Sequence, residues 1–337
     1  MRNFAFQDVP QLCAVLLGMF LLFNPLMAGG KIYVGNAEGD DITVIDPDNF
    51  KVIGNIKVGH KPHGLTASPN RDRIYVSVES TNELLALDAL TYRVVGRAKV
   101  GKVPNQVTVT ADGRYVYVPL REQAAVDIVD SNAMKVIKRV ELAEWPHNSY
   151  TAADGKRVYV TTINGRKIFV FDPSTHNVVA VIEPGGKVRP VALTRDNSRM
   201  YVALSEFHGF GVVDLRQVKT VRRVELPPLP AGTPRPYLDT YTHGLALTPD
   251  ERELWVTSCP GGAMWVYSAP ELKRLAKVDV GKFPNWLAFT PDGKKLFVSN
   301  TESDTVSAID VPNRKVLATI AVGKAPKRIM YLAQPSR

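Results

Sequence analysis

The chain has 337 residues, of which 45% are hydrophobic, and it carries a formal net charge of +9 with only two cysteines. So few cysteines exclude a disulfide-held scaffold, and stability must come from packing. The length also leaves room for a single large all-β domain, since such domains commonly exceed the usual domain size.

Residues 1–28 differ from the rest of the chain. Arg2 precedes an apolar stretch over 12–23, a break follows at Asn24 and Pro25, and small residues come next. This order predicts a secretory signal peptide rather than a membrane anchor, with an uncleaved anchor as the alternative. We therefore expect a periplasmic or secreted protein with no transmembrane domain after leader removal. Its remaining thiol, Cys259, is expected to be a small buried apolar group.

Export makes nucleic acid an improbable partner for the positive charge. We expect an acidic redox protein, an anionic ligand or a membrane surface instead, bound by a monomer or within a hetero-complex.

A sequence repeat recurs through the chain, and each copy contains an aromatic residue followed by valine. The spacing is 42 residues, except for an interval of 54 between Tyr201 and Trp255 that contains a Pro-rich insertion at 227–239. The aromatic anchors are Tyr33, Tyr75, Tyr117, Tyr159, Tyr201, Trp255 and Phe297. Regular repeats of this length indicate a propeller or a solenoid.

Within one repeat, residues 74–78, 83–88, 93–100 and 106–110 read as strands separated by Asn, Asp, Gly and Pro. This pattern predicts a four-stranded antiparallel meander, and no useful helical period occurs. An acidic residue recurs at the turn after the second of these runs, and we expect it to cap that turn rather than to bind metal. These acids are Asp46, Asp88, Asp130, Asp172, Asp214 and Asp310.

Seven such units over residues 29–337 predict an all-β fold, a single seven-bladed β-propeller with four-stranded antiparallel blades. The first copy begins at a second strand, and the chain ends on a first strand at 328–332. Pairing of the N- and C-terminal strands is therefore expected to close the ring and to remove two exposed edges.

The segments 31–36 and 296–300, with the turn Thr290-Pro-Asp-Gly293, resemble the YVTN-repeat β-propeller family. The resemblance covers essentially the whole chain after the leader. It implies the propeller fold, in a family that includes surface-layer proteins, lactonase-like enzymes and accessory proteins of redox pathways. No Trp-Asp dipeptide occurs, which disfavours the WD40 type.

The residue that opens each innermost strand varies while its surroundings stay nearly constant. These channel-mouth positions are His63, Asn105, His147, Arg189, His243, Asn285 and Lys327. The three histidines are two, two and three blades apart, as near to a triangle as a sevenfold ring permits. Converging imidazoles predict a transition-metal site for Cu, Zn or Fe on His63, His147 and His243. Solvated histidines at a wet channel mouth and a site for an anionic organic ligand are the alternatives.

The segments Trp145-Pro-His147 and Pro62-His63-Gly64 are similar to innermost-strand starts in the propeller domain of dissimilatory haem nitrite reductases. The resemblance implies a non-covalent haem. It makes His63 an axial ligand, His147 and His243 distal groups, and Arg189 and Lys327 the partners of haem carboxylates. No Cys-x-x-Cys-His motif for covalent attachment occurs.

None of the channel-mouth positions is acidic, and we expect most of the nearby loop acids to be solvated, namely Glu79, Glu144, Glu206 and Asp239. We expect the insertion at 227–239 to cover the channel mouth. The sequence thus favours an exported propeller that binds a metal or haem-like cofactor and acts as a redox-accessory or cofactor-handling protein rather than a stand-alone enzyme. An interaction scaffold without cofactor and a lactonase-like hydrolase are the alternatives.

Overall fold

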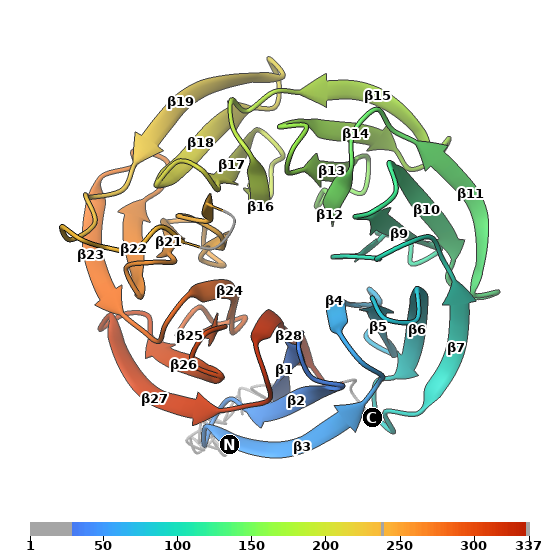
Figure 1. The fold of residues 1–337 in the computed structure, drawn as a ribbon, viewed down its shortest axis with the longest axis horizontal. Helices are drawn as coiled ribbons and strands as arrows, with labels where there is room; N and C mark the ends of the chain where they lie inside the picture. Colours follow the sequence, from blue (N-terminus) through green and yellow to red (C-terminus); the bar gives the residue numbers. More distant parts are fainter. Residues whose placement is uncertain (1–28, 237–238, 335–337) are drawn as a thin grey trace, which may run out of the picture.

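The computed structural model describes residues 29–236 and 239–334. In these residues the strands form seven four-stranded antiparallel sheets arranged radially around a central channel (Figure 1). They contain no α-helix, and so none that could cross a membrane. The predicted seven-bladed β-propeller is confirmed, whereas the signal peptide predicted for 1–28 lies outside the described residues.

The strands of each blade follow one another along the chain from the channel outward, except in the first blade. The first blade contains β28 (Pro326–Ala333), β1 (Gly30–Asn36), β2 (Asp41–Asp46) and β3 (Lys51–Lys57). The second contains β4 (Pro62–Ala67), β5 (Arg73–Val78), β6 (Glu83–Asp88) and β7 (Val94–Lys99). The third contains β8 (Thr108–Val109), β9 (Tyr115–Leu120), β10 (Ala125–Asp130) and β11 (Lys135–Glu141).

The remaining four blades repeat this order without exception. The fourth contains β12 (Pro146–Thr151), β13 (Val158–Thr162), β14 (Ile168–Asp172) and β15 (Asn177–Ile182). The fifth contains β16 (Val188–Leu193), β17 (Arg199–Leu204), β18 (Gly209–Asp214) and β19 (Lys219–Glu225). The sixth contains β20 (Leu245–Leu247), β21 (Glu253–Ser258), β22 (Ala263–Ser268) and β23 (Arg274–Asp279). The seventh contains β24 (Pro284–Phe289), β25 (Lys295–Asn300), β26 (Thr305–Asp310) and β27 (Lys315–Ala321).

The repeated aromatic residues supply the core between neighbouring blades. Tyr75 of the second blade packs with Val116 and Val118 of the third in one buried cluster, and Trp255 of the sixth packs with Leu296 of the seventh in another. Each sheet thus buries both faces against its neighbours, which explains why the second and third strands read as continuous apolar runs rather than alternating ones.

The N- and C-terminal strands pair as predicted. β28 is antiparallel to β1, with Tyr331 opposite Ile32 and Ile329 opposite Val34. Ile329 is buried in a cluster that also contains Phe297 of the preceding blade. The last strand therefore joins the end of the chain to its beginning and covers the edge of β1 that would otherwise be unpaired.

The repeated aspartates cap their turns, as the sequence indicates. The Oδ1 atom of Asp88 accepts hydrogen bonds from the backbone N–H groups of Leu90 and Thr91, at 3.0 and 2.7 Å. Asp130 and Asp214 make the same pair of contacts with the residues two and three positions later.

The innermost strand of the third blade is shorter than predicted. β8 covers only Thr108–Val109, although the sequence predicts a strand over 106–110. Gln106 leaves this ladder because its side chain bonds to both backbone groups of Leu65 in the second blade. Its carbonyl oxygen accepts from the N–H of Ser149 in the fourth. One residue therefore ties three neighbouring blades together at the channel wall.

The seam between β28 and β1 can be tested with Ile329→Asp. This change places a charge without a partner in a buried cluster, and we expect it to lower the free energy of unfolding by more than about 3 kcal/mol. Leu317→Asp, on the exposed side of β27 in the blade beside the seam, is the matched control and should cost less than about 1 kcal/mol. Urea unfolding gives the free energy of unfolding of both variants. An equal decrease in the two would contradict the conclusion that the pairing of β28 with β1 stabilises the ring.

Candidate ligand site at the channel mouth

Five of the seven channel-mouth residues are the second residue of an innermost strand, and Asn105 and His243 lie just before β8 and β20. The three histidines are buried, with His63 5%, His147 4% and His243 5% exposed. Arg189, Asn105 and Asn285 are buried as well, whereas Lys327 is partly exposed. The alternative of ordinary solvated histidines is therefore wrong, because converging strands shield these side chains from water.

Local sequence explains how the innermost strands come so close at this end of the channel. Gly64 and Gly244 follow His63 and His243, and a Cβ atom at either glycine would overlap the carbonyl oxygen of the channel-mouth asparagine in the next blade. Only glycine permits this approach. The His-Gly pairs are thus a packing requirement as well as a source of imidazoles.

A cavity of about 290 Å³ lies at this mouth of the channel. It is lined by five basic side chains and only two acidic ones, together with the three histidines. The basic residues are Lys61, Arg121, Arg189, Lys327 and Arg328, and the acids are Glu38 and Glu79. We call it the basic cavity, and its excess of positive charge favours an anionic ligand.

Arg328 is a buried cation of the basic cavity that the sequence did not predict, and Lys61, Arg121 and Glu38 were not predicted either. Arg328 is 1% exposed, and its Nη2 atom donates to Asn105 and Asn148, both at 3.0 Å. Its guanidinium group lies 4.0 Å from the ring centre of Trp286, while Nε and Nη1 are buried without a hydrogen-bond partner. Burial lowers its pKa to about 9.

A signal for Arg328 exists in the sequence. It occupies the position directly after the channel-mouth residue, where the other copies carry an uncharged residue. Those residues are Gly64, Gln106, Asn148, Pro190, Gly244 and Trp286. Reading one position further along the register would have identified this charge as an exception to the repeat.

Arg189 is a second buried cation without an acidic partner. Its Nε donates to the hydroxyl of Ser205 at 2.6 Å and its Nη2 to the hydroxyl of Thr240 at 2.9 Å. Burial lowers its pKa to about 10, so it remains charged at neutral pH. Thr240, which directly follows the insertion, lines the basic cavity, and the cover that the insertion is expected to form over the mouth stays a prediction. Residues 237–238 of the insertion lie outside the described part of the chain.

His63 is paired with Glu79, whose carboxylate oxygen lies 2.5 Å from Nδ1. Burial lowers the pKa of His63 to about 3, although Glu79 opposes that change. Burial alone would raise the pKa of Glu79, but His63, Arg121 and Lys327 outweigh it and bring the value to about 2. The pair therefore consists of a neutral imidazole that presents Nδ1–H to an ionised carboxylate, which leaves Nε2 as a lone-pair donor.

Glu79 is the exception among the four acids near the mouth, because its side chain is only 11% exposed. Glu144, Glu206 and Asp239 keep 32%, 27% and 27% of their side-chain surface exposed. Glu79 differs because it follows β5 at the channel and faces His63, a partner that sequence spacing alone does not reveal.

The other two imidazoles are also neutral. Burial, together with the cations Arg189 and Arg328, holds the pKa values of His147 and His243 well below the usual range. Nδ1 of His243 lies 3.1 Å from the carbonyl oxygen of Asn285 and so must donate to it. Nδ1 of His147 is buried with no hydrogen-bond partner.

The structure brings His63 and His147 close together, with ring centres 6.5 Å apart and nearly perpendicular planes. No three His, Cys, Asp or Glu side chains within residues 29–236 and 239–334 come near enough to hold a metal ion. The transition-metal site on His63, His147 and His243 stays a prediction, and the neighbouring arginines oppose a bare cation there.

Cys259 lies near the same mouth and is buried. Its thiol contacts the carbonyl oxygen of Pro284 at 3.3 Å, and burial raises its pKa to about 12. A thiol that stays protonated is unreactive, so its place is that of a small apolar group, as predicted.

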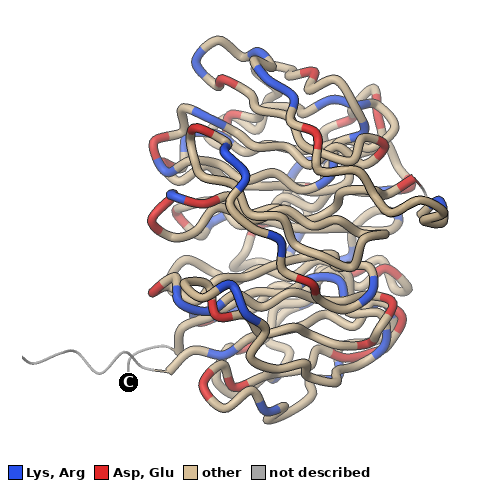
Figure 2. The backbone as a smooth tube through the Cα atoms, turned by 90° about the vertical axis from the view of Figure 1, so that its left-hand side faces the viewer, with Lys and Arg blue, Asp and Glu red and all other residues tan. Residues whose placement is uncertain are grey.

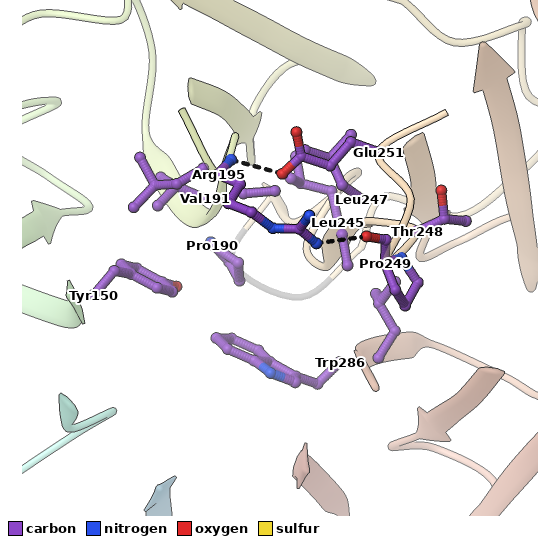
Figure 3. Close-up of a pocket in the computed structure, with 14 residues that line it drawn as sticks. Tyr150, Pro190, Val191, Arg195, Leu245, Leu247, Thr248, Pro249, Glu251 and Trp286 are labelled. Atoms are coloured by element: carbon purple, nitrogen blue, oxygen red, sulfur yellow. Dashed lines mark hydrogen bonds between the residues drawn. The ribbon is translucent and has the colours of Figure 1, made fainter. Parts of the chain in front are cut away.

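The opposite end of the channel holds a second cavity of about 320 Å³ (Figure 3). Tyr150 and Trp286 line it, but its charged groups are already engaged. The N–H of Arg195 donates to Glu251 at 2.6 Å, and its guanidinium donates to the carbonyl of Pro249 at 2.8 Å. Unpaired buried cations therefore distinguish the basic cavity from this one.

On the outside of the ring, the charges are mixed. Lys and Arg segments alternate with Asp and Glu segments along the loops in side view (Figure 2). The acidic redox partner and the hetero-complex expected from the net charge stay predictions.

These features define a seven-bladed propeller with a buried, basic, imidazole-lined channel mouth. A family model for YNCE-like beta-propellers matches residues 68–242, and the chain belongs to this family. No protein of curated function matches the sequence.

Solved structures share the fold at low identity. Hydrazine synthase of Kuenenia stuttgartiensis is 18% identical with a TM-score of 0.73, over 84% of this chain and 93% of that one. The periplasmic gluconolactonase PpgL of Pseudomonas aeruginosa is 19% identical with a TM-score of 0.74, over 90% and 99%. The dihydro-haem d1 dehydrogenase NirN is 14% identical with a TM-score of 0.65, over 89% and 74%. At these identities the similarity shows the fold alone.

The buried histidines make stability depend on pH in a window where few carboxylates titrate. Their folded-state pKa values are lowered, so only the unfolded chain takes up protons near the ordinary histidine pKa of about 6.5. The contribution of these histidines to the free energy of unfolding is therefore fully present above that pH. It decreases as the pH falls toward their folded-state pKa values. Between pH 7 and pH 5 we expect a loss of up to about 2 kcal/mol per buried histidine.

The measurement is urea unfolding at both pH values for the wild type and for the His63→Gln, His147→Gln, His243→Gln triple variant. The triple variant should show a clearly smaller pH dependence. An identical slope in the two proteins would mean that these imidazoles are not held neutral by the fold.

Proposed function

We propose that this chain is an exported propeller that binds a carboxylate-bearing, haem-like cofactor in the basic cavity and handles that cofactor as a redox-accessory protein. The observation that carries the proposal is the presence of two buried guanidinium groups, Arg189 and Arg328, with no acidic partner. A buried charge without a partner is costly, and an anionic ligand removes that cost.

The residues of the cavity fit such a group. The Nε and Nη1 atoms of Arg328 are buried donors without acceptors, and carboxylates are the anions that guanidinium groups bind best. Lys327 lines the same cavity and adds a third cation. Arg328, which the resemblance to haem nitrite reductases did not identify, is thus the strongest candidate to hold a carboxylate, with Arg189 and Lys327 beside it.

His63 is the candidate iron ligand. A carboxylate behind an imidazole fixes the tautomer and ring orientation and raises the basicity of the other nitrogen, as in many metal-binding histidines. Neither His147 nor His243 has a carboxylate at its Nδ1 atom. When bound, a haem would supply a redox-active iron, while the protein would orient the group and shield it from water.

Export is part of the proposal. It is supported by the leader-like sequence of residues 1–28 and by the similarity to PpgL, a protein described as periplasmic. The similarity to NirN, described in complex with its tetrapyrrole ligand, supports a cofactor site in a propeller of this type.

Titration of the purified protein with haem and with metal-free protoporphyrin separates the two kinds of contact. The wild type should bind both, with a shifted Soret band for haem. His63→Ala should abolish that shift yet still bind the metal-free porphyrin, because the carboxylate contacts remain. Arg328→Gln should raise the Kd of both ligands at least tenfold, since a hydrogen bond to a charged group contributes about 1.5–3 kcal/mol.

Arg166→Gln is the matched control on the same face. Arg166 is 54% exposed and already paired with Glu206 at 2.9 Å, so this change should leave binding unaltered. If neither haem nor porphyrin binds the wild type, or if Arg328→Gln binds both as well as the wild type does, the proposed function is wrong.

A second candidate function is a lactonase-like hydrolase, favoured by the His63–Glu79 pair. A neutral imidazole oriented by a carboxylate is also the arrangement of a general base, and the arginines would stabilise negative charge that develops on a lactone oxygen. The gluconolactonase PpgL shares the fold. If the protein hydrolyses gluconolactone faster than the uncatalysed rate and His63→Ala does not, the result would favour this function. If the wild type does not accelerate hydrolysis, the hydrolase function is wrong.

A further inference from the structure

A third cavity, of about 520 Å³, lies beside the basic cavity on the same face of the propeller. The two cavities share three lining residues, Arg121, His147 and Arg189, and are therefore neighbouring parts of one depression. We call the second part the side cavity. A ligand group bound at Arg189 in the basic cavity has the side cavity as its adjoining space.

The side cavity has an apolar wall. Trp145, Pro146 and Ile163 line it, with Lys187 and Asp239 at other positions of its lining. The basic cavity contains no comparable apolar surface apart from Ala37 and Phe283. The depression as a whole is thus amphipathic, with buried cations in one part and apolar side chains in the other.

Trp145 is the unusual member of this wall. It belongs to the loop that connects β11 to β12 and is 54% exposed, although an indole is among the largest apolar groups a protein contains. Trp255 is fully buried, and Trp265 and Trp286 pack against core clusters. Trp145 belongs to no core cluster among the described residues, so its ring is free to stack against a ligand.

We propose that Trp145, Pro146 and Ile163 form a stacking subsite for the flat apolar body of the ligand whose carboxylate is bound by Arg189 and Arg328. The ligand class is planar aromatic carboxylates, of which a porphyrin is one member. This inference rests on the proposed function and adds to it a requirement for a flat apolar body. A compact sugar acid or dicarboxylate would occupy the basic cavity alone.

The test uses two carboxylate probes, 2-naphthoate with a flat apolar body and the compact dicarboxylate succinate, with Kd values measured by calorimetry. Trp145→Ala should raise the Kd of naphthoate about tenfold, because the aromatic contact and its buried area are lost. The same variant should leave the Kd of succinate unchanged. Trp145→Phe keeps an aromatic face and should therefore lose less affinity for naphthoate than Trp145→Ala does.

Two further variants complete the experiment. Ile137→Ala, at an apolar side chain on the outer strand β11 that is 49% exposed, is the control and should bind both probes like the wild type. Arg328→Gln should weaken both probes. Because Arg328 and Trp145 would contact opposite ends of one ligand, their effects on naphthoate should be nearly additive in the double variant.

The possible failures are distinguishable. If both probes bind the wild type in an Arg328-dependent manner and Trp145→Ala binds naphthoate normally, the stacking subsite is wrong and the proposed function survives. If succinate binds the wild type in an Arg328-dependent manner and naphthoate does not bind, the stacking subsite is also wrong. If neither probe binds the wild type, both proposals fall together.

Discussion

The closure of the ring by β28 and β1 is the constraint on which the channel mouth depends. Closure completes the ring of seven sheets, in which the innermost strands surround the central channel (Figure 1). It also places Arg328, which belongs to the closing strand itself, among Asn105, Asn148 and Trp286 from three other blades. Without pairing between the chain ends, this guanidinium group would have no fixed position.

Placing cations in this closed space has an energetic consequence. Each buried guanidinium loses its hydration, and the hydroxyl and amide partners of Arg189 and Arg328 compensate only part of that loss. The same desolvation makes any anion that enters the cavity interact more strongly than it would at the surface. The protein tolerates this desolvation cost because the apolar clusters between the blades, which consist of residues other than those at the channel mouth, stabilise the fold. Stability and binding are therefore supplied by different parts of each repeat.

The sequence predicts the fold because each repeat contains all the strand and turn signals that one blade needs. The aromatic-valine pairs, the turn aspartates and the spacing of 42 residues all specify the same four-stranded unit, and the odd strand at each end specifies closure. The channel-mouth positions follow from that register. The sequence could not show that these residues are buried, because burial results from the approach of separate blades at Gly64 and Gly244.

The partners within the site were harder to predict for a related reason. Glu79 and His63 belong to one blade, but their contact depends on how the loop after β5 folds back over the mouth, which spacing does not encode. The short β8 has a similar origin, since Gln106 bonds to Leu65 and Ser149 of its two neighbouring blades. Repeats predict what each blade does by itself, whereas contacts between blades depend on residues that depart from the repeat.

The charges and the imidazoles of the mouth act together in the proposed function. Burial and the neighbouring Arg328 lower the pKa of all three histidines, and Arg189 adds to this for His147 and His243, so that lone pairs remain available at neutral pH. The same cations repel a free divalent metal ion, which explains why an array of imidazoles need not form a simple metal site. A metal carried inside an anionic chelate meets no such barrier, because the carboxylates and ring charge of the chelate offset the arginines. In the proposed function, the electrostatics of the mouth would therefore favour a metal that is already bound within an anionic organic ligand over a free metal ion.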